Sequence, residues 1–96
     1  MVEKLGDGDR EERLGRLGSW VYDGAAGAID KVFKFKSFSE AFGFMVRVAL
    51  EAQKADHHPD WSNSYDTVTI RLSTHDACGL SQKDLDLAKA IDALLT

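Results

Sequence analysis

The sequence predicts an α+β domain in which helices pack on a mainly antiparallel four-stranded sheet, in the order α-β-β-α-β-β-α. Three observations support this fold class. Residues 37–56 combine a helix-start motif with apolar residues at helical spacing. Residues 67–73 alternate strictly between apolar and polar side chains. Glycine or proline stands at several of the points where the chain is expected to turn.

Length and composition are those of a soluble globular domain. The chain has 96 residues, of which 44% are hydrophobic and 29% charged, and its net charge is -4. We therefore expect one domain over residues 1–96 with a single core. The acidic balance argues against direct binding of nucleic acid, which relies on clustered Lys and Arg. No apolar run approaches the roughly 20 residues of a membrane span, and the lone Cys78 excludes an internal disulfide.

The first third of the chain is predicted to hold a short helix and two strands. Residues 1–9 carry several charges and two glycines, and we expect them to be loose. A helix is expected over residues 10–17. A first strand opens at Trp20, and two glycines then turn the chain into a second strand over residues 28–36. Most apolar side chains of that second strand fall on one of its two faces: Ile29, Phe33 and Phe35.

A long helix is predicted from Ser37 to about Asp56. Ser37 and Glu40 form a capping box, in which each side chain satisfies a free backbone N–H at the helix start. The helix must stop before His58, because the residue before a proline avoids the helical region. Its apolar residues go almost all the way round: Phe38, Phe42, Phe44, Met45, Val46, Val48, Ala49, Leu50 and Ala52. One sheet cannot cover that circumference, so we expect a second subunit against the remainder.

The rest of the chain is predicted to form a strand pair and a last helix. Residues 67–73 form the alternating strand, and residues 63–65 supply a short partner strand that turns at Asp66. Ser81 caps the last helix, and Leu80 packs against Leu85 across that cap. The inner face of this helix is assigned to Leu85, Ala88, Ile91 and Leu95. Its acidic residues are interpreted as a solvated face: Asp84, Asp86 and Asp92.

All three histidines fall in one window, as His57-His58-Pro59 and Thr74-His75-Asp76. The unperturbed pKa of histidine, about 6.5, lets it both donate and accept a proton near neutral pH. The cluster therefore predicts a proton-transfer site. Two other interpretations remain open from the residues alone. One is a polar helix end without catalytic chemistry, where cationic histidines interact favourably with the helix dipole. The other is a metal site, which is disfavoured because adjacent side chains diverge.

The residues around the histidines resemble the pterin-4a-carbinolamine dehydratase family. The resemblance covers about residues 20–95 and rests on four segments: Asp56-His57-His58-Pro59-Asp60-Trp61-Ser62-Asn63-Ser64-Tyr65, Leu72-Ser73-Thr74-His75-Asp76, Gly79-Leu80-Ser81-x-x-Asp84, and Phe35-Lys36-x-Phe38-x-x-Ala41-Phe42-Gly43-Phe44-Met45. A lone His-His-Pro would be a weak signal, whereas this spacing is specific. The sequence departs from the family at three positions: Gln53 replaces a common glutamate, Asp66 a common asparagine, and Cys78 a small residue.

The resemblance implies loss of water from a 4a-hydroxy-tetrahydropterin to give the quinonoid dihydropterin, as a step in tetrahydrobiopterin recycling. It implies three catalytic histidines, with His57 and His75 as the acid/base pair and His58 mainly binding and orienting the pterin. Substrate-binding roles are expected for four neighbours: Trp61, Ser73, Thr74 and Asp76.

The resemblance also implies a homodimer or homotetramer with no metal and no bound cofactor. In some animal members the same fold serves as a dimerisation partner of a homeodomain transcription factor. An alternative function is therefore an interaction module whose helix 38–55 docks onto a partner's helices. The three intact histidines favour the enzyme. We expect a cytoplasmic protein, which could also enter the nucleus, and no membrane partner.

Overall fold

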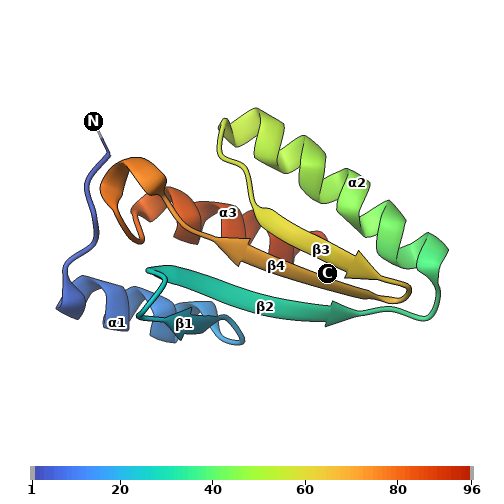
Figure 1. The fold of residues 1–96 in the computed structure, drawn as a ribbon, viewed down its shortest axis with the longest axis horizontal. Coiled ribbons are helices and arrows are strands. Elements are labelled where there is room, and N and C mark those ends of the chain that lie inside the picture. The colour runs from blue at the N-terminus through green and yellow to red at the C-terminus, as the bar shows by residue number, and fades with distance from the viewer. Residues whose placement is uncertain (1, 96) are drawn as a thin grey trace.

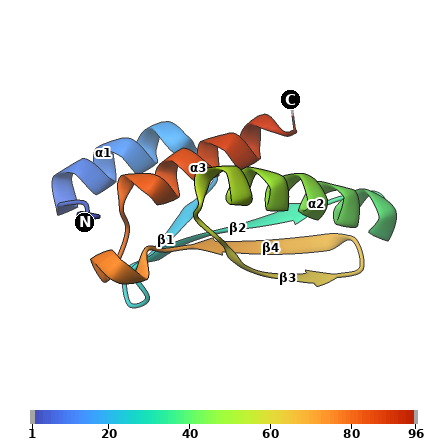
Figure 2. The same ribbon diagram turned by 90° about the horizontal axis from the view of Figure 1, so that it is seen from above.

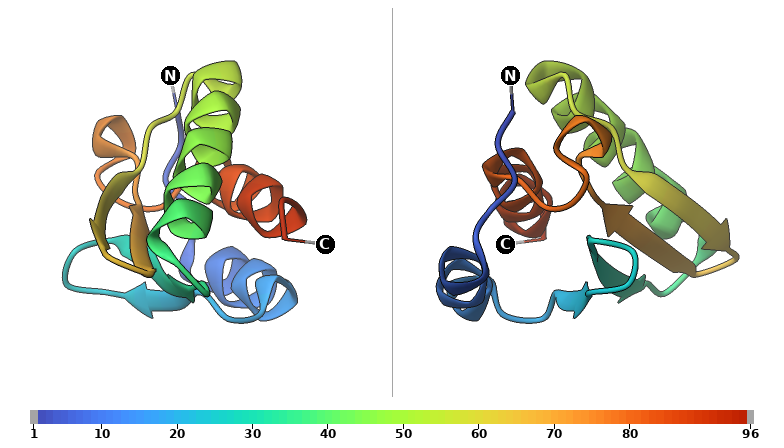
Figure 3. Two further views of the ribbon diagram at one scale, coloured as in Figure 1. Left: turned by 90° about the vertical axis from the view of Figure 1, so that its right-hand side faces the viewer. Right: turned by 60° about the vertical axis from the view of Figure 1, so that its left-hand side comes forward.

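The computed structural model describes residues 2–95 and confirms the predicted fold class. Its elements are α1 (Asp7–Leu17), β1 (Val21–Asp23), β2 (Ala28–Lys34), α2 (Phe38–Ala55), β3 (Asp60–Ser64), β4 (Thr67–Leu72), the short 3-10 helix η1 (His75–Ala77) and α3 (Gln82–Ala93). The strands form one antiparallel sheet in the order β1-β2-β4-β3 (Figure 1). All three α-helices cover the same face of that sheet, as Figures 2 and 3 show. The fold therefore has two layers.

The core lies between the helices and the inner face of the sheet. Ile29 of β2 pairs with Leu72 of β4, and Phe33 pairs with Val68, so alternate residues of both strands point at the helices. The predicted alternation over residues 67–73 is confirmed, because its apolar members are fully buried. Two helices complete the core with these side chains: Ala41, Phe44, Val48 and Ala52 from α2, and Leu85, Leu87, Ala88 and Ile91 from α3.

The long helix α2 is capped at Ser37, as predicted. The Ser37 Oγ accepts a hydrogen bond from the Glu40 N–H at 3.2 Å, and the Glu40 carboxylate accepts one from the Lys36 N–H, also at 3.2 Å. One side of this helix stays uncovered, with exposed fractions near one half or more: Phe38 48%, Phe42 52%, Val46 47% and Leu50 65%. The sheet therefore leaves an apolar face on α2, as expected from the sequence. None of the helices described over residues 2–95 is long and apolar enough to cross a bilayer.

Near the N-terminus, the structure corrects two predicted boundaries. The first helix begins at Asp7. The carboxylates of Asp7 and Asp9 lie in its first turn, where they interact favourably with the positive end of the helix dipole. The Leu5 N–H also donates to the Leu80 carbonyl at 2.8 Å. The segment predicted to be loose is therefore ordered from Leu5 onward, and Met1 lies outside the described residues. The second strand ends at Lys34, two residues before the predicted end.

Two further boundaries differ in the second half of the chain. Strand β3 begins at Asp60, directly after the proline, and is longer than the predicted segment 63–65. At the C-terminus Leu95 is 48% exposed, and Leu94 packs partly buried against the core in its place. The helix α3 ends at Ala93, so the spacing used to assign Leu95 no longer applies there.

The acidic residues of α3 do not form one solvated face, which corrects the prediction. Asp86 is exposed, but Asp84 is fully buried. Asp92 is half-buried and accepts hydrogen bonds from Trp20 Nε1 at 3.0 Å and from Lys31 Nζ at 2.8 Å. Lys31 interrupts the inward-facing apolar parity of β2, and its ammonium is accommodated there because this carboxylate compensates it.

Candidate active site

The three histidines line one hollow of about 360 Å³. His57 and His58 come from the loop after α2, His75 begins η1, and Lys83 belongs to the first turn of α3. The described residues around the hollow are Val2, Asp56, His57, His58, Ser73, Thr74, His75, Asp76 and Lys83. Figure 1 shows the end of α2, the η1 turn and the start of α3 gathered near the N-terminal segment. Segments from the start, middle and end of the chain therefore build one site.

A left-handed residue at the end of α2 positions His57. Asp56 has φ 51° and ψ 43°, a conformation that Asp tolerates better than most residues because its short side chain can hydrogen-bond locally. The N–H groups of Asp56 and His57 donate to the carbonyls of Gln53 and Ala52, at 3.2 and 3.1 Å. This turn leaves the His57 ring only 11% exposed.

Asp84 is the buried centre of a hydrogen-bond cluster beside the hollow. Its Oδ1 lies 2.6 Å from His57 Nε2, and its Oδ2 accepts from Thr74 Oγ1 at 2.8 Å and from the Ser81 N–H at 3.0 Å. Thr74 Oγ1 also lies 2.7 Å from Ser81 Oγ. Because the threonine proton goes to the carboxylate, the serine hydroxyl donates in that second contact. The cluster thus links the loop after α2, the end of β4 and the start of α3.

The Asp84 carboxylate fixes the tautomer of His57. An ionised carboxylate only accepts hydrogen bonds, so the neutral imidazole carries its proton on Nε2 and its lone pair on Nδ1. His57 can therefore accept a proton at Nδ1 and return it.

The other two histidines are more open than His57. His58 and His75 are both exposed, and both line the hollow. Among residues 2–95 neither ring takes part in a side-chain hydrogen bond, so their nitrogens can meet a ligand. The same range contains no group of three His, Cys, Asp or Glu side chains arranged to hold a metal ion.

Three of the four predicted substrate-binding residues lie at the hollow, and the fourth does not. Ser73, Thr74 and Asp76 are lining residues, although the Thr74 hydroxyl is already bound to Asp84 and Ser81. Trp61 pairs with Ile70 across β3 and β4 and packs partly buried against the core. Its pairing with the buried Ile70 places Trp61 on the face of the sheet that the helices cover. Contact between Trp61 and a pterin stays a prediction.

Sequence reasoning gave no role in the site to three lining residues, Val2, Asp56 and Lys83, or to Asp84 beside the hollow. Asp84 precedes Leu87, Ala88 and Ile91 by three, four and seven residues. That spacing places the carboxylate on the buried stripe of α3 and was the signal available for it. Lys83 is an exposed cation beside the hollow and carries no comparable signal. Gln53, the departure nearest the histidines, is exposed on α2 and is not among the described lining residues.

Known proteins match this chain in sequence and in fold over almost its whole length. The model of the family described as pterin 4 alpha carbinolamine dehydratase matches residues 3–94. A protein of Rhodospirillum rubrum, provisionally named as a pterin-4-alpha-carbinolamine dehydratase, is 56% identical over 95 residues and 99% of each chain. The solved structure of a transcriptional coactivator/pterin dehydratase from Brucella melitensis is 40% identical with a TM-score of 0.91, covering 96% of this chain and 98% of its own. A pterin dehydratase-like protein described as a RuBisCO assembly factor in the alpha-carboxysome shares the fold, with a TM-score of 0.69, 23% identity and coverage of 79% and 88%.

Proposed function

This chain belongs to the pterin-4-alpha-carbinolamine dehydratase family, and we propose that it removes water from a 4a-hydroxy-tetrahydropterin. The observation that carries the proposal is the convergence of His57, His58 and His75 on one hollow. The volume of that hollow, about 360 Å³, is near the lower end of the roughly 300–1,000 Å³ typical of ligand pockets. A flat two-ring heterocycle is a ligand of suitable size.

The proposed reaction needs one proton to be donated and one to be accepted. The 4a-hydroxyl leaves as water once an acid protonates its oxygen. A ring N–H loses its proton, and the electron pair it leaves forms the new C=N bond to the 4a carbon. No oxidant or reductant is required, and the site recovers its starting protonation by exchange with solvent. General acid/base catalysis of this type is typically worth about 10² to 10⁴ in rate.

The arrangement of the histidines supports a division of roles. His57 is held by Asp84 with its lone pair on Nδ1, which suits it to accept the ring N–H proton. His75 lines the same hollow from η1 and would donate to the leaving hydroxyl. His58 adjoins His57 and would hydrogen-bond the edge of the pterin. Asp76 and Ser73 offer further polar groups at the same hollow.

The decisive experiment is an absorbance assay of quinonoid dihydropterin formation with purified protein. The wild-type chain should accelerate dehydration above the uncatalysed background, and the double variant His57→Ala/His75→Ala should return the rate to that background. Circular dichroism must show that the variant keeps its fold. A matched double variant at exposed positions away from the hollow, Lys34→Ala/Lys36→Ala, should keep the wild-type rate. A His57→Ala/His75→Ala protein with an unchanged rate would refute the proposal.

A second function is favoured by one specific observation, the apolar face of α2. Four exposed apolar residues recur every fourth position along this helix: Phe38, Phe42, Val46 and Leu50. Exposed apolar patches of this kind commonly mark interaction sites. We therefore also propose that this face binds a second subunit or an apolar helix of a partner protein, as an interaction module would.

Sedimentation of two matched variants tests this second function. Val46→Asp places a charge within the apolar face and should convert an oligomer to a monomer. Arg47→Gln lowers the net charge by the same one unit at an exposed position of the same helix outside that face, and it should leave the assembly intact. A wild-type chain that sediments as a monomer, and captures no helical partner, would rule this function out.

A further inference from the structure

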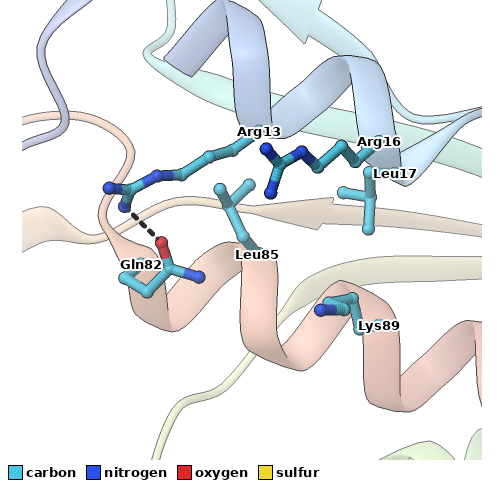
Figure 4. A pocket seen from close by; sticks show the side chains of 6 residues that line it. All are labelled: Arg13, Arg16, Leu17, Gln82, Leu85 and Lys89. Carbon is cyan, nitrogen blue, oxygen red and sulfur yellow. Dashed lines mark hydrogen bonds between the residues drawn. The ribbon is translucent and has the colours of Figure 1, made fainter. Parts of the chain in front are cut away.

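A second hollow, of about 200 Å³, lies between α1 and α3 and shares no lining residue with the histidine site. Arg13, Arg16 and Leu17 project from α1, and Gln82, Leu85 and Lys89 lie opposite on α3 (Figure 4). Three of these six side chains are cationic and none is acidic. That lining stands out in a chain whose net charge is -4, because it concentrates positive charge where the molecule as a whole is negative.

The contacts of Arg13 distinguish this hollow from an ordinary charged surface. Within residues 2–95 four cationic residues are half-buried, and three of them face carboxylates: Arg10 with Asp7, Lys31 with Asp92, and Arg71 with Asp23 and Asp30. Arg13 is the fourth. Its guanidinium donates to the neutral Gln82 Oε1 at 2.5 Å, so its charge is held in place without being compensated.

Of the two neighbouring cations, Arg16 is ion-paired and Lys89 is not. Arg16 follows Arg13 by three residues on the same helix, a spacing at which side chains are neighbours and like charges repel. Arg16 is paired with Glu12 at 2.7 Å. The Lys89 side chain has no ion-pair or hydrogen-bond partner among residues 2–95. The Gln82 amide nitrogen donates to Asp86 at 2.9 Å, which orients its oxygen toward Arg13. Arg13 and Lys89 are therefore left as two uncompensated positive charges around one hollow.

From these contacts we propose that the α1–α3 hollow binds a small organic anion with two negative charges. Guanidinium groups bind carboxylates through paired, charge-assisted hydrogen bonds, and two uncompensated cations match two carboxylates. Leu17 and Leu85 supply apolar wall, which favours a carbon chain over a bare inorganic ion. The hollow, of about 200 Å³, is smaller than the roughly 300–1,000 Å³ typical of pockets for drug-sized ligands. This size matches a dicarboxylate of about four carbons.

The test is an NMR titration of the full chain with succinate at constant ionic strength, with backbone and arginine side-chain N–H signals observed. Saturable shifts are expected at Arg13, Arg16, Gln82 and Lys89, while the signals of His57 and His75 stay in place. Butyrate, which has the same carbon count and one charge, should bind at least about tenfold more weakly, since one charge-assisted contact is lost. Succinamide, which is neutral, should cause no saturable shift.

Two double variants with the same change in net charge complete the experiment. Arg13→Gln/Lys89→Gln should weaken succinate binding by at least about tenfold. Arg47→Gln/Lys54→Gln removes one arginine and one lysine from exposed positions on α2 and should bind as the wild type does. Shifts spread over all surface cations, equal binding by both variants, or phosphate binding as tightly as succinate would overturn the assignment. The readout is independent of dehydratase activity, so this proposal and the proposed function can fail separately.

Discussion

Asp84 is a fully buried carboxylate that also supports a histidine of the proposed active site. An ionised carboxylate inside a protein is costly unless hydrogen bonds replace its water shell. Here the two oxygens face His57 Nε2, the Thr74 hydroxyl and the Ser81 N–H, and the side chain is fully buried. No buried polar side-chain atom in the described range lacks a partner. The carboxylate therefore completes the capping box of α3, whose N-cap is Ser81, and supports His57.

We predict that Asp84→Asn lowers kcat by roughly 10- to 100-fold, part of the about 10² to 10⁴ that acid/base catalysis supplies. The amide cannot accept at both of its ends, so either His57 or Thr74 loses its acceptor. Imidazole nitrogen-15 spectra should show a changed tautomer balance for His57, which a loss of stability alone would not produce. Asp86→Asn is the matched control on the same helix, because Asp86 is exposed. Unaltered kcat and spectra in Asp84→Asn would contradict the role assigned to this carboxylate.

At the scale of elements, the turn between β1 and β2 supports the loop that carries His75. Gly27 in this turn has φ +63°, and a Cβ atom there would lie 3.0 Å from the Gly79 Cα. Gly79 is bonded to Thr74 through the backbone, with Thr74 N–H donating to the Gly79 carbonyl at 3.0 Å. Two segments distant in sequence therefore meet at glycines, because any larger residue would separate them.

Replacing Gly27 by alanine should lower the free energy of unfolding by about 1 to 3 kcal/mol. A non-glycine residue in the left-handed region costs about 1 to 2 kcal/mol, and the contact with the Gly79 backbone has no flexible side chain that could yield. Gly43→Ala is the control, because nothing lies within 4 Å of a Cβ at that position in α2. That change should stabilise the helix by about 0.5 to 1 kcal/mol. Urea unfolding of both variants measures the difference, and equal values would refute the argument.

The outer face of the sheet contains an ion-pair network whose effect on stability depends on pH. Hydrogen bonds from the Ala26 N–H and from Arg71 lower the pKa of Asp23 below its ordinary value of 3.8. Because this pKa is lower in the folded state, the stability that ionised Asp23 contributes is complete above pH 3.8. It is lost as the pH falls through the folded-state pKa. Asp23→Asn should therefore be less stable than wild type at neutral pH, with a difference that shrinks below pH 3.8.

Thermal unfolding between pH 2 and pH 7 tests this pH dependence. Glu11→Gln removes an exposed carboxylate from α1 that has no partner within the described residues, and it should leave the neutral-pH stability close to that of wild type. If the difference between wild type and Asp23→Asn stayed constant across the whole pH range, Asp23 would not be the group responsible.

At the scale of the whole molecule, the features that could be predicted depend on residues close together in the sequence, whereas those that could not depend on contacts between residues far apart in it. The Ser37 cap, the alternation over residues 67–73 and the element order depend on neighbours in sequence, and the structure confirms them. The contact of Asp84 with His57 spans 27 residues, and that of Asp92 with Trp20 spans 72. Local spacing places a carboxylate on a helix face but does not say which distant group it meets. The assignment of Asp84 to solvent failed for that reason.

The N-terminal segment is the part of the site that its sequence least suggests. Val2 lines the histidine hollow, and Lys4 lies over Gly79 at the end of the His75 loop. This arrangement is held by Leu5, whose side chain packs against the core and whose N–H donates to the Leu80 carbonyl. The N-terminal segment therefore forms part of the wall of a site that is otherwise built by the middle and the end of the chain.

We predict that Leu5→Ala releases this segment and lowers both stability and kcat/KM. Loss of a half-buried leucine side chain should cost about 1 to 2 kcal/mol, and displacement of Val2 would remove part of the wall of the hollow, which lowers kcat/KM several-fold. Leu95→Ala is the matched control, because that side chain is 48% exposed and distant from the histidines. Urea unfolding and the dehydration assay measure the two effects separately. A Leu5→Ala protein that lost stability but kept its kcat/KM would show that the segment supports the fold without contributing to the site.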